Sequence, residues 1–141
     1  MIDSTEMLNY IYETSDMGCY GILTVLDQAE DEKFRSALQE QLTEYKRLRD
    51  VSKQHLHRRG KKAEGVNPMA KVSSRMMSTM KTLTDHSSSK IAEMMIEGNT
   101  MGVTKSIQHL NDYPEKDEIR DLAAQLLKTE ENNIEQMKQF L

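Results

Sequence analysis

Glu130 is the residue of this sequence whose position most needs a chemical explanation. It lies in the last predicted helix, on an apolar stripe that recurs at helical spacing and comprises Leu126, Ile134, Met137 and Leu141. A charged side chain on such a stripe is costly to bury unless it has hydrogen-bond partners. One interpretation is a buried polar network that fixes helix register, with Tyr45, Gln41 or Asn133 as the partner. The other is exposure at a frayed helix end or an interface.

A second candidate site is the basic stretch KQHLHRRGKK, at residues 53 to 62. Its cations are Lys53, Arg58, Arg59, Lys61 and Lys62. They could bind phosphate or nucleic acid, because basic side chains release condensed counterions when they neutralise a polyanion. Basic residues are equally typical of a solvated helix C-terminus. The chain has no recognised nucleic-acid-reading motif and few aromatic residues, so nucleic acid is not the favoured partner.

Charge is distributed very unevenly along the chain. Residues 46 to 81 contain eleven basic and two acidic side chains, whereas residues 1 to 45 contain two basic and ten acidic ones, for a net charge of −4 overall. Together with eleven methionines, of which Met77 and Met95 are expected at the surface, this asymmetry predicts a homodimer. An unidentified protein partner is the other possibility.

No pattern in the chain supports catalysis. There is no Gly-rich phosphate loop, no cysteine with a histidine partner and no Ser-His-acid arrangement at a defensible spacing. The single cysteine, Cys19, is predicted on a core face, where it acts as a small hydrophobe. No secretion signal and no apolar stretch of the roughly 20 residues needed for a membrane span is present. We therefore expect a cytoplasmic protein without a membrane partner and predict no catalytic residue.

The elements that carry these residues are predicted to be helices. Two prolines, six glycines and many residues that favour helices indicate an all-α fold, and 141 residues suit a single domain, 1–141. Periodicity predicts four long helices, at about 4–26, 32–57, 90–110 and 115–141. A short amphipathic helix is predicted after Pro68, with a break at 84–89. Since 60–89 can run back along the molecule, the second and third long helices should be parallel in a four-helix bundle.

Three stretches carry a resemblance to a known superfamily: LQEQLTEYKRL, KIAEMMIEGNTMGVTKSIQHLNDY and LAAQLLKTEENNIEQMKQFL. The chain resembles the ferritin-like superfamily, particularly small bacterial families of unknown function with a short helix in the crossover. The last stretch is similar to the Glu-Glu-x-x-His helix of that superfamily, with Asn133 in place of the histidine. Ferritin-like proteins hold two metal ions between one Glu from each of two helices and Glu-x-x-His from each of the others.

The resemblance implies one acidic metal ligand on each long helix. The four candidates are Asp16, Glu44, Glu97 and Glu130. No histidine follows an acid by three residues, so the chain has no complete Glu-x-x-His. A site of carboxylates alone is harder and suits manganese, magnesium or calcium better than iron. The resemblance itself implies iron or manganese as the cofactor, but without the histidines the centre is expected to be degenerate or absent.

These observations predict a non-catalytic helical bundle that acts as a binding or assembly module. A carboxylate-rich metal-binding protein, oxidase-like or for storage, is the first alternative, and convergence of the four acids in the core would favour it. An anion- or nucleic-acid-binding protein is the second, and salt-sensitive retention on a polyanion column would favour that.

Overall fold

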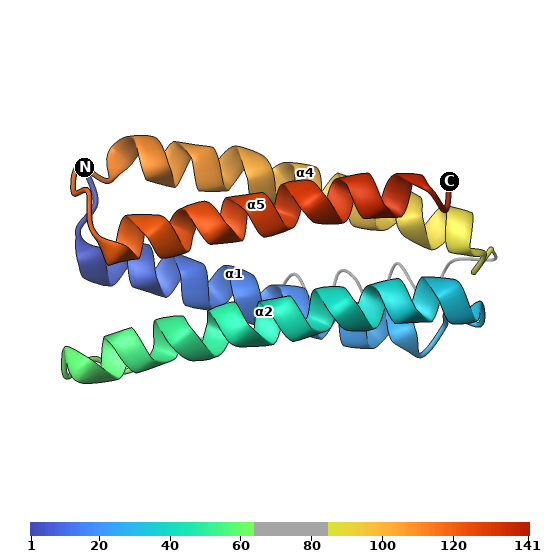
Figure 1. Cartoon of the computed structure of the whole chain (residues 1–141), viewed down its shortest axis with the longest axis horizontal. Coiled ribbons are helices and arrows are strands. Elements are labelled where there is room, and N and C mark those ends of the chain that lie inside the picture. Colours follow the sequence, from blue (N-terminus) through green and yellow to red (C-terminus); the bar gives the residue numbers. More distant parts are fainter. Residues whose placement is uncertain (64–84) are drawn as a thin grey trace.

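The computed structural model describes residues 1–63 and 85–141, and these residues form helices and connecting loops without a strand (Figure 1). The helices are α1 (Ser4–Leu26), α2 (Glu32–Arg58), α4 (Ser88–Asp112) and α5 (Glu118–Lys138). The four long helices expected from periodicity are confirmed, with ends that differ by at most three residues. The expected short helix after Pro68 lies outside the described residues.

Each helix begins at a residue that the sequence marks as a cap. The side chains of Asp3, Asp31, Ser87 and Asp117 each accept a hydrogen bond from a backbone N–H in the first turn of the following helix. Such side chains satisfy amide groups that have no partner within the helix. The predicted break before α4 is confirmed at residues 85–87, which are not helical.

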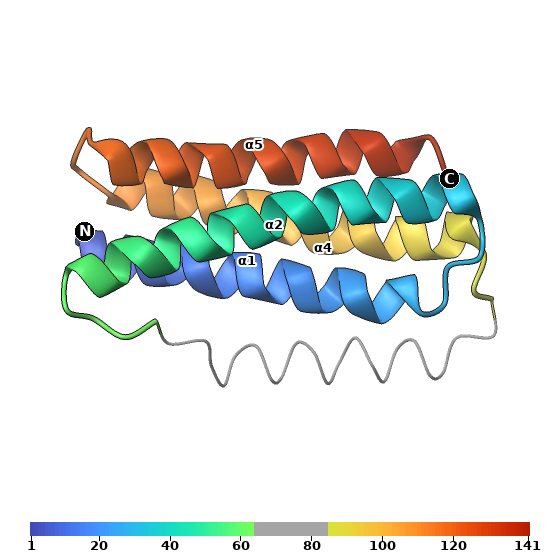
Figure 2. The same ribbon diagram turned by 60° about the horizontal axis from the view of Figure 1, so that its bottom comes forward.

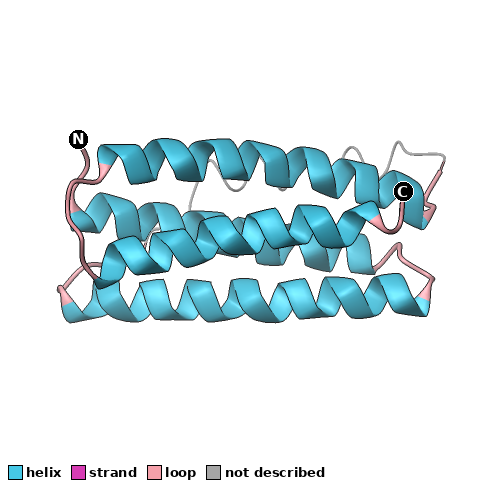
Figure 3. Ribbon diagram, turned by 45° about the horizontal axis from the view of Figure 1, so that its top comes forward, coloured by secondary structure: helices cyan, strands magenta, loops and turns pink. Residues whose placement is uncertain are grey.

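The helices form two antiparallel hairpins. α1 packs mainly against α2 and α4 mainly against α5, whereas contacts between the hairpins are fewer and those between α1 and α4 are sparse. Figures 1 and 2 show α2 and α4 running in the same direction, as the length of the connection predicts. The loops of the described residues lie at the two ends of the bundle (Figure 3). In the described ranges no helix is long and apolar enough to span a membrane.

An arginine closes each hairpin in the same way. Arg35, in the first turn of α2, donates to the carbonyl oxygens of Leu26, the last residue of α1, and of Ala29 in the loop. Arg120, in the first turn of α5, donates to the carbonyl oxygens of Leu110, in the last turn of α4, and of Tyr113 just after it. Carbonyl groups at a helix end lack helical partners, so a guanidinium that binds them fixes the angle of the turn.

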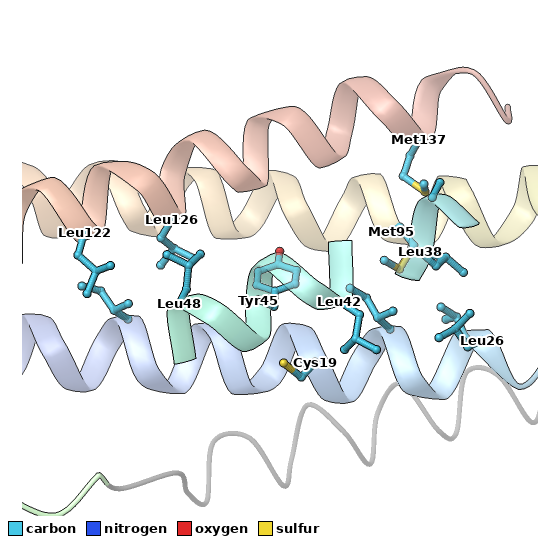
Figure 4. Packing of buried hydrophobic residues seen from close by; sticks show 14 of the residues in the cluster. Cys19, Leu26, Leu38, Leu42, Tyr45, Leu48, Met95, Leu122, Leu126 and Met137 are labelled. Carbon is cyan, nitrogen blue, oxygen red and sulfur yellow. The ribbon is translucent and has the colours of Figure 1, made fainter. Parts of the chain in front are cut away.

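The core lies between the hairpins and includes Tyr45 from α2 (Figure 4). Tyr45 is 5 % exposed, and its hydroxyl points away from α1 and donates to Asn99 Oδ1 on α4, at 3.0 Å. Its ring lies over Gly18 of α1, and the absence of a side chain at this glycine allows the close approach. Met95, expected at the surface, is 8 % exposed and belongs to the core, because it lies on the side of α4 that faces the bundle. The homodimer stays a prediction.

We expect Gly18→Ala to destabilise the protein by about 1–3 kcal/mol. A methyl group at this position would lie 2.7 Å from ring atoms of Tyr45, and the hydrogen bond to Asn99 opposes a shift of the ring. Gly98→Ala is the matched control, because nothing lies within 4 Å of a methyl group there. Urea denaturation should show the control unchanged or stabilised by up to about 1 kcal/mol. Equal effects of the two substitutions would contradict the close contact.

Candidate functional site

Glu130 is buried, as its place on the apolar stripe predicts, with 2 % of its surface exposed. Its hydrogen-bond partner differs from the three that the sequence suggested. Ser106 on α4 donates to Glu130 Oε1 at 2.7 Å, and the Tyr10 hydroxyl lies 2.9 Å from the same Ser106 oxygen. Tyr10 in turn stacks on His109, with 3.7 Å between the ring centroids. A chain of polar groups therefore links the buried carboxyl to two helices of the bundle.

The position of Gly102 explains why α4 supplies the partner. A side chain at Gly102 would collide with Glu130 Oε2, so the carboxyl group occupies the space that a side chain would fill. Ser106 lies one turn further along the same face and reaches the other carboxyl oxygen. The sequence contains a signal for this arrangement, because Gly98, Gly102 and Ser106 form a stripe of small residues at a spacing of four.

The other partners that the sequence suggested for Glu130 do not bind it. Gln41 donates to Gln136 Oε1 at 2.8 Å, while its own Oε1 and Asn133 Nδ2 are buried without a partner among the described residues. Both side chains line a polar pocket of about 290 Å³ between α2 and α5. The buried network that the sequence suggested, with Tyr45, Gln41 or Asn133 as the partner of Glu130, is therefore not formed among the described residues, and Glu130, Tyr45 and Gln41 belong to separate groups of hydrogen bonds.

Burial raises the pKa values of Glu130 and of the two phenols beside it. Loss of solvation raises the pKa of Glu130 from 4.5 to about 7, although the hydrogen bond from Ser106 opposes this. Burial likewise raises the pKa of Tyr10 to about 12 and that of Tyr45 further, and the nearby Glu130 charge adds to both shifts. Glu130 is thus a group that can gain or lose a proton near neutral pH, beside phenols that stay protonated.

Glu130 and Tyr45 both face a pocket between α1 and α4, here named the α1–α4 pocket, which has a volume of about 570 Å³. Most of its wall is apolar or lacks side chains, and its polar groups come from all four helices. The residues that line it are Tyr10, Glu13, Thr14, Met17, Gly18, Gly21, Ile22, Thr24, Tyr45, Met94, Met95, Gly98, Asn99, Met101, Gly102, Lys105, Gln108, His109 and Glu130. The pocket exists because the two helices that form its walls make few direct contacts.

The acids nominated as metal ligands lie in different surroundings. Asp16 is partly exposed and lies 3.7 Å from Arg49, while Glu44 is 40 % exposed and pairs with Arg47 at 2.6 Å. Glu97 is exposed, and Glu130 alone is buried. Within residues 1–63 and 85–141, no three His, Cys, Asp or Glu side chains are close enough to hold a metal ion. The four-acid centre implied by the resemblance stays a prediction without geometric support from these residues.

The basic stretch forms an exposed end of the bundle. Its five cations are all exposed, on the last turns of α2 and in the loop that follows. Gly60, in the left-handed conformation at φ 69°, ends the helix between them. Exposure is compatible with anion binding and with simple solvation, so the anion site stays a prediction.

No known protein family matches the chain, and no curated protein or solved structure shows significant similarity to it. Inference about function therefore rests on the pocket and the residues that line it.

We expect Glu130→Gln to stabilise the protein increasingly as pH rises. Since the folded-state pKa lies above the ordinary value, the stability due to Glu130 is complete below about pH 4.5 and is lost as pH rises through 7. The neutral amide avoids this loss and should exceed wild type by about 2–3 kcal/mol at pH 8, and by little at pH 5. Urea denaturation at several pH values measures the difference. Glu131→Gln, an exposed neighbour on α5, is the control, and a pH-independent difference for Glu130→Gln would contradict the assignment.

Metal loading tests the four-acid centre directly. Because three of the acids are solvated or paired with arginine, we expect less than one equivalent of iron or manganese per chain after loading and desalting. Elemental analysis provides the measurement. About two equivalents in wild type, lost in Glu130→Gln, would establish the dinuclear centre instead.

Proposed function

We propose that this protein is a non-catalytic binding module, whose site is the α1–α4 pocket. The observation that carries the proposal is the buried carboxyl group of Glu130 at the wall of a pocket of about 570 Å³. The pocket lies between α1 and α4, which make few direct contacts with each other. The direction of the four helices supports the further proposal that the bundle is ferritin-like with a degenerate or absent metal centre.

The size and lining of the pocket suit a small organic molecule. Binding sites for such molecules typically occupy about 300–1,000 Å³ and combine apolar walls with a few polar groups. Here the apolar contribution comes largely from Met17, Met94 and Met101, whose flexible side chains adapt to different shapes. Glu130 and Asn99 supply polar contacts that would orient a ligand.

The phenols and the thiol near the pocket favour binding of a ligand over nucleophilic attack on it. Burial raises the pKa of Tyr10 and of Tyr45, so both phenols stay protonated and act as hydrogen-bonding groups at neutral pH. Burial also raises the pKa of the Cys19 thiol, and Cys19 is not among the described residues that line the pocket. Neither a tyrosinate nor a thiolate is thus available to attack a ligand.

A neutral fluorescent probe, 1-N-phenylnaphthylamine, tests the pocket. We expect wild-type protein to bind about one probe per chain with a blue-shifted emission, because the probe would enter an apolar environment. Gly98→Leu should weaken binding at least tenfold, since a Cβ at this position meets nothing within 4 Å and the rest of the leucine side chain would occupy space at the pocket wall.

Gly98→Ala is the control for this substitution, because it adds one methyl group and leaves most of the volume free. It should bind the probe as wild type does. Absence of probe binding to wild type, or equal binding to Gly98→Leu, would overturn the assignment of the site.

A further inference from the structure

We propose that the α1–α4 pocket selects an organic cation, specifically a primary amine attached to an apolar body, and that the ammonium group pairs with Glu130. This inference rests on the proposed function, because it names the class of ligand for the same pocket. It follows from the single hydrogen bond that Glu130 accepts and from the lack of a cationic partner for it among the described residues.

Glu130 has one hydrogen bond and no cation among the described residues. Ser106 is the single side chain that donates to it, and none of the salt bridges formed by these residues includes it. An ionised carboxylate accepts up to about four hydrogen bonds, and a buried one without a counterion is costly. An ammonium group would supply both the missing charge and additional donors.

The second carboxyl oxygen, Glu130 Oε2, lies beside Gly102 at the wall of the pocket, and both residues line it. Gly98, one turn earlier on α4, leaves open space at the same wall. Asn99 Oδ1 accepts one hydrogen bond from Tyr45 and retains capacity for another donor. An ammonium group carries three N–H donors, which suits a wall made of acceptors.

The other ionisable groups of the pocket favour a cation over an anion. α1 contributes Glu13 and Tyr10, α2 contributes Tyr45, and α4 contributes Lys105 and His109. Lys105 is exposed and forms no salt bridge with Glu130 in the part of the chain that the structure describes. His109 is held at the wall by its stacking on Tyr10 and by a 2.8 Å contact between its Nδ1 and the Lys105 carbonyl oxygen.

Binding of an amine must compete with binding of a proton to Glu130. The pKa of about 7 means that the carboxyl group is mostly neutral at pH 6 and mostly ionised at pH 8. Amine affinity should therefore rise about tenfold between these values, since a primary alkylamine stays protonated throughout. A neutral ligand of the same shape has no such dependence.

Displacement of 1-N-phenylnaphthylamine by n-octylamine and by 1-octanol tests the proposal. These two ligands share an apolar chain and differ in charge. With wild-type protein we expect octylamine to displace the probe about tenfold more effectively than octanol at pH 8, with the advantage largely lost at pH 6. Glu130→Gln should remove the advantage at both pH values, and the control Glu131→Gln should keep it.

The outcomes separate this inference from the proposed function. If the neutral probe binds but octylamine and octanol displace it equally, the amine preference is wrong and the pocket stands. If the probe does not bind, the proposed function itself fails. An amine preference that persists in Glu130→Gln would assign the cation to another group, such as Glu13. The wild-type pH profile tests the proposal even if the variant folds poorly.

Discussion

The architecture depends on two close contacts in which a large polar side chain replaces the missing side chain of a glycine. In one hairpin the ring of Tyr45 lies over Gly18, and in the other the carboxyl group of Glu130 lies against Gly102. Both glycines belong to the helices that form the walls of the α1–α4 pocket. Each hairpin therefore brings a polar group from its second helix, α2 or α5, to the same space between α1 and α4.

This arrangement has an energetic cost that apolar packing would avoid. A buried carboxyl group loses solvation, and the single hydrogen bond from Ser106 does not compensate for it, which is why the pKa of Glu130 rises to about 7. Leucine at this position would complete the stripe formed by Leu126 and Met137. Buried polar groups can instead specify which helix faces meet, and here the Ser106 bond does so for α4 and α5.

Helices and their directions were predictable because the signals for them are local. Caps such as Asp31 and Ser87 mark helix starts, and the length of the connection determines the parallel course of α2 and α4. Burial of Glu130 was predictable from its stripe. Its partner was not, since Ser106 reaches it only in the register that Gly102 allows, and register is set by packing between helices.

The surface acids show the same limit of local reasoning. Periodicity places Asp16 at the edge of an apolar stripe, and such a position can face either the core or solvent. It places Glu44 between the directions of Leu48 and Val51. The structure gives each an arginine, Arg49 and Arg47, which holds the carboxylate at the surface. Spacing reveals Arg47 as a neighbour of Glu44, three residues along the same helix, but it does not reveal Arg49, which reaches Asp16 from another helix.

A single buried acid in an open pocket suits reversible binding better than a fixed metal site. Metal ions in proteins require several converging ligands, and those ligands must stay deprotonated. Glu130 instead can stay buried as a neutral carboxyl group when the pocket is empty, because it can take up a proton near neutral pH. An ammonium ligand would displace that proton and supply a counterion, which Glu130 has in none of the salt bridges of the described residues. The same desolvation that makes the empty carboxylate costly would then strengthen its attraction to a bound cation, since both charges would share the same low-dielectric surroundings.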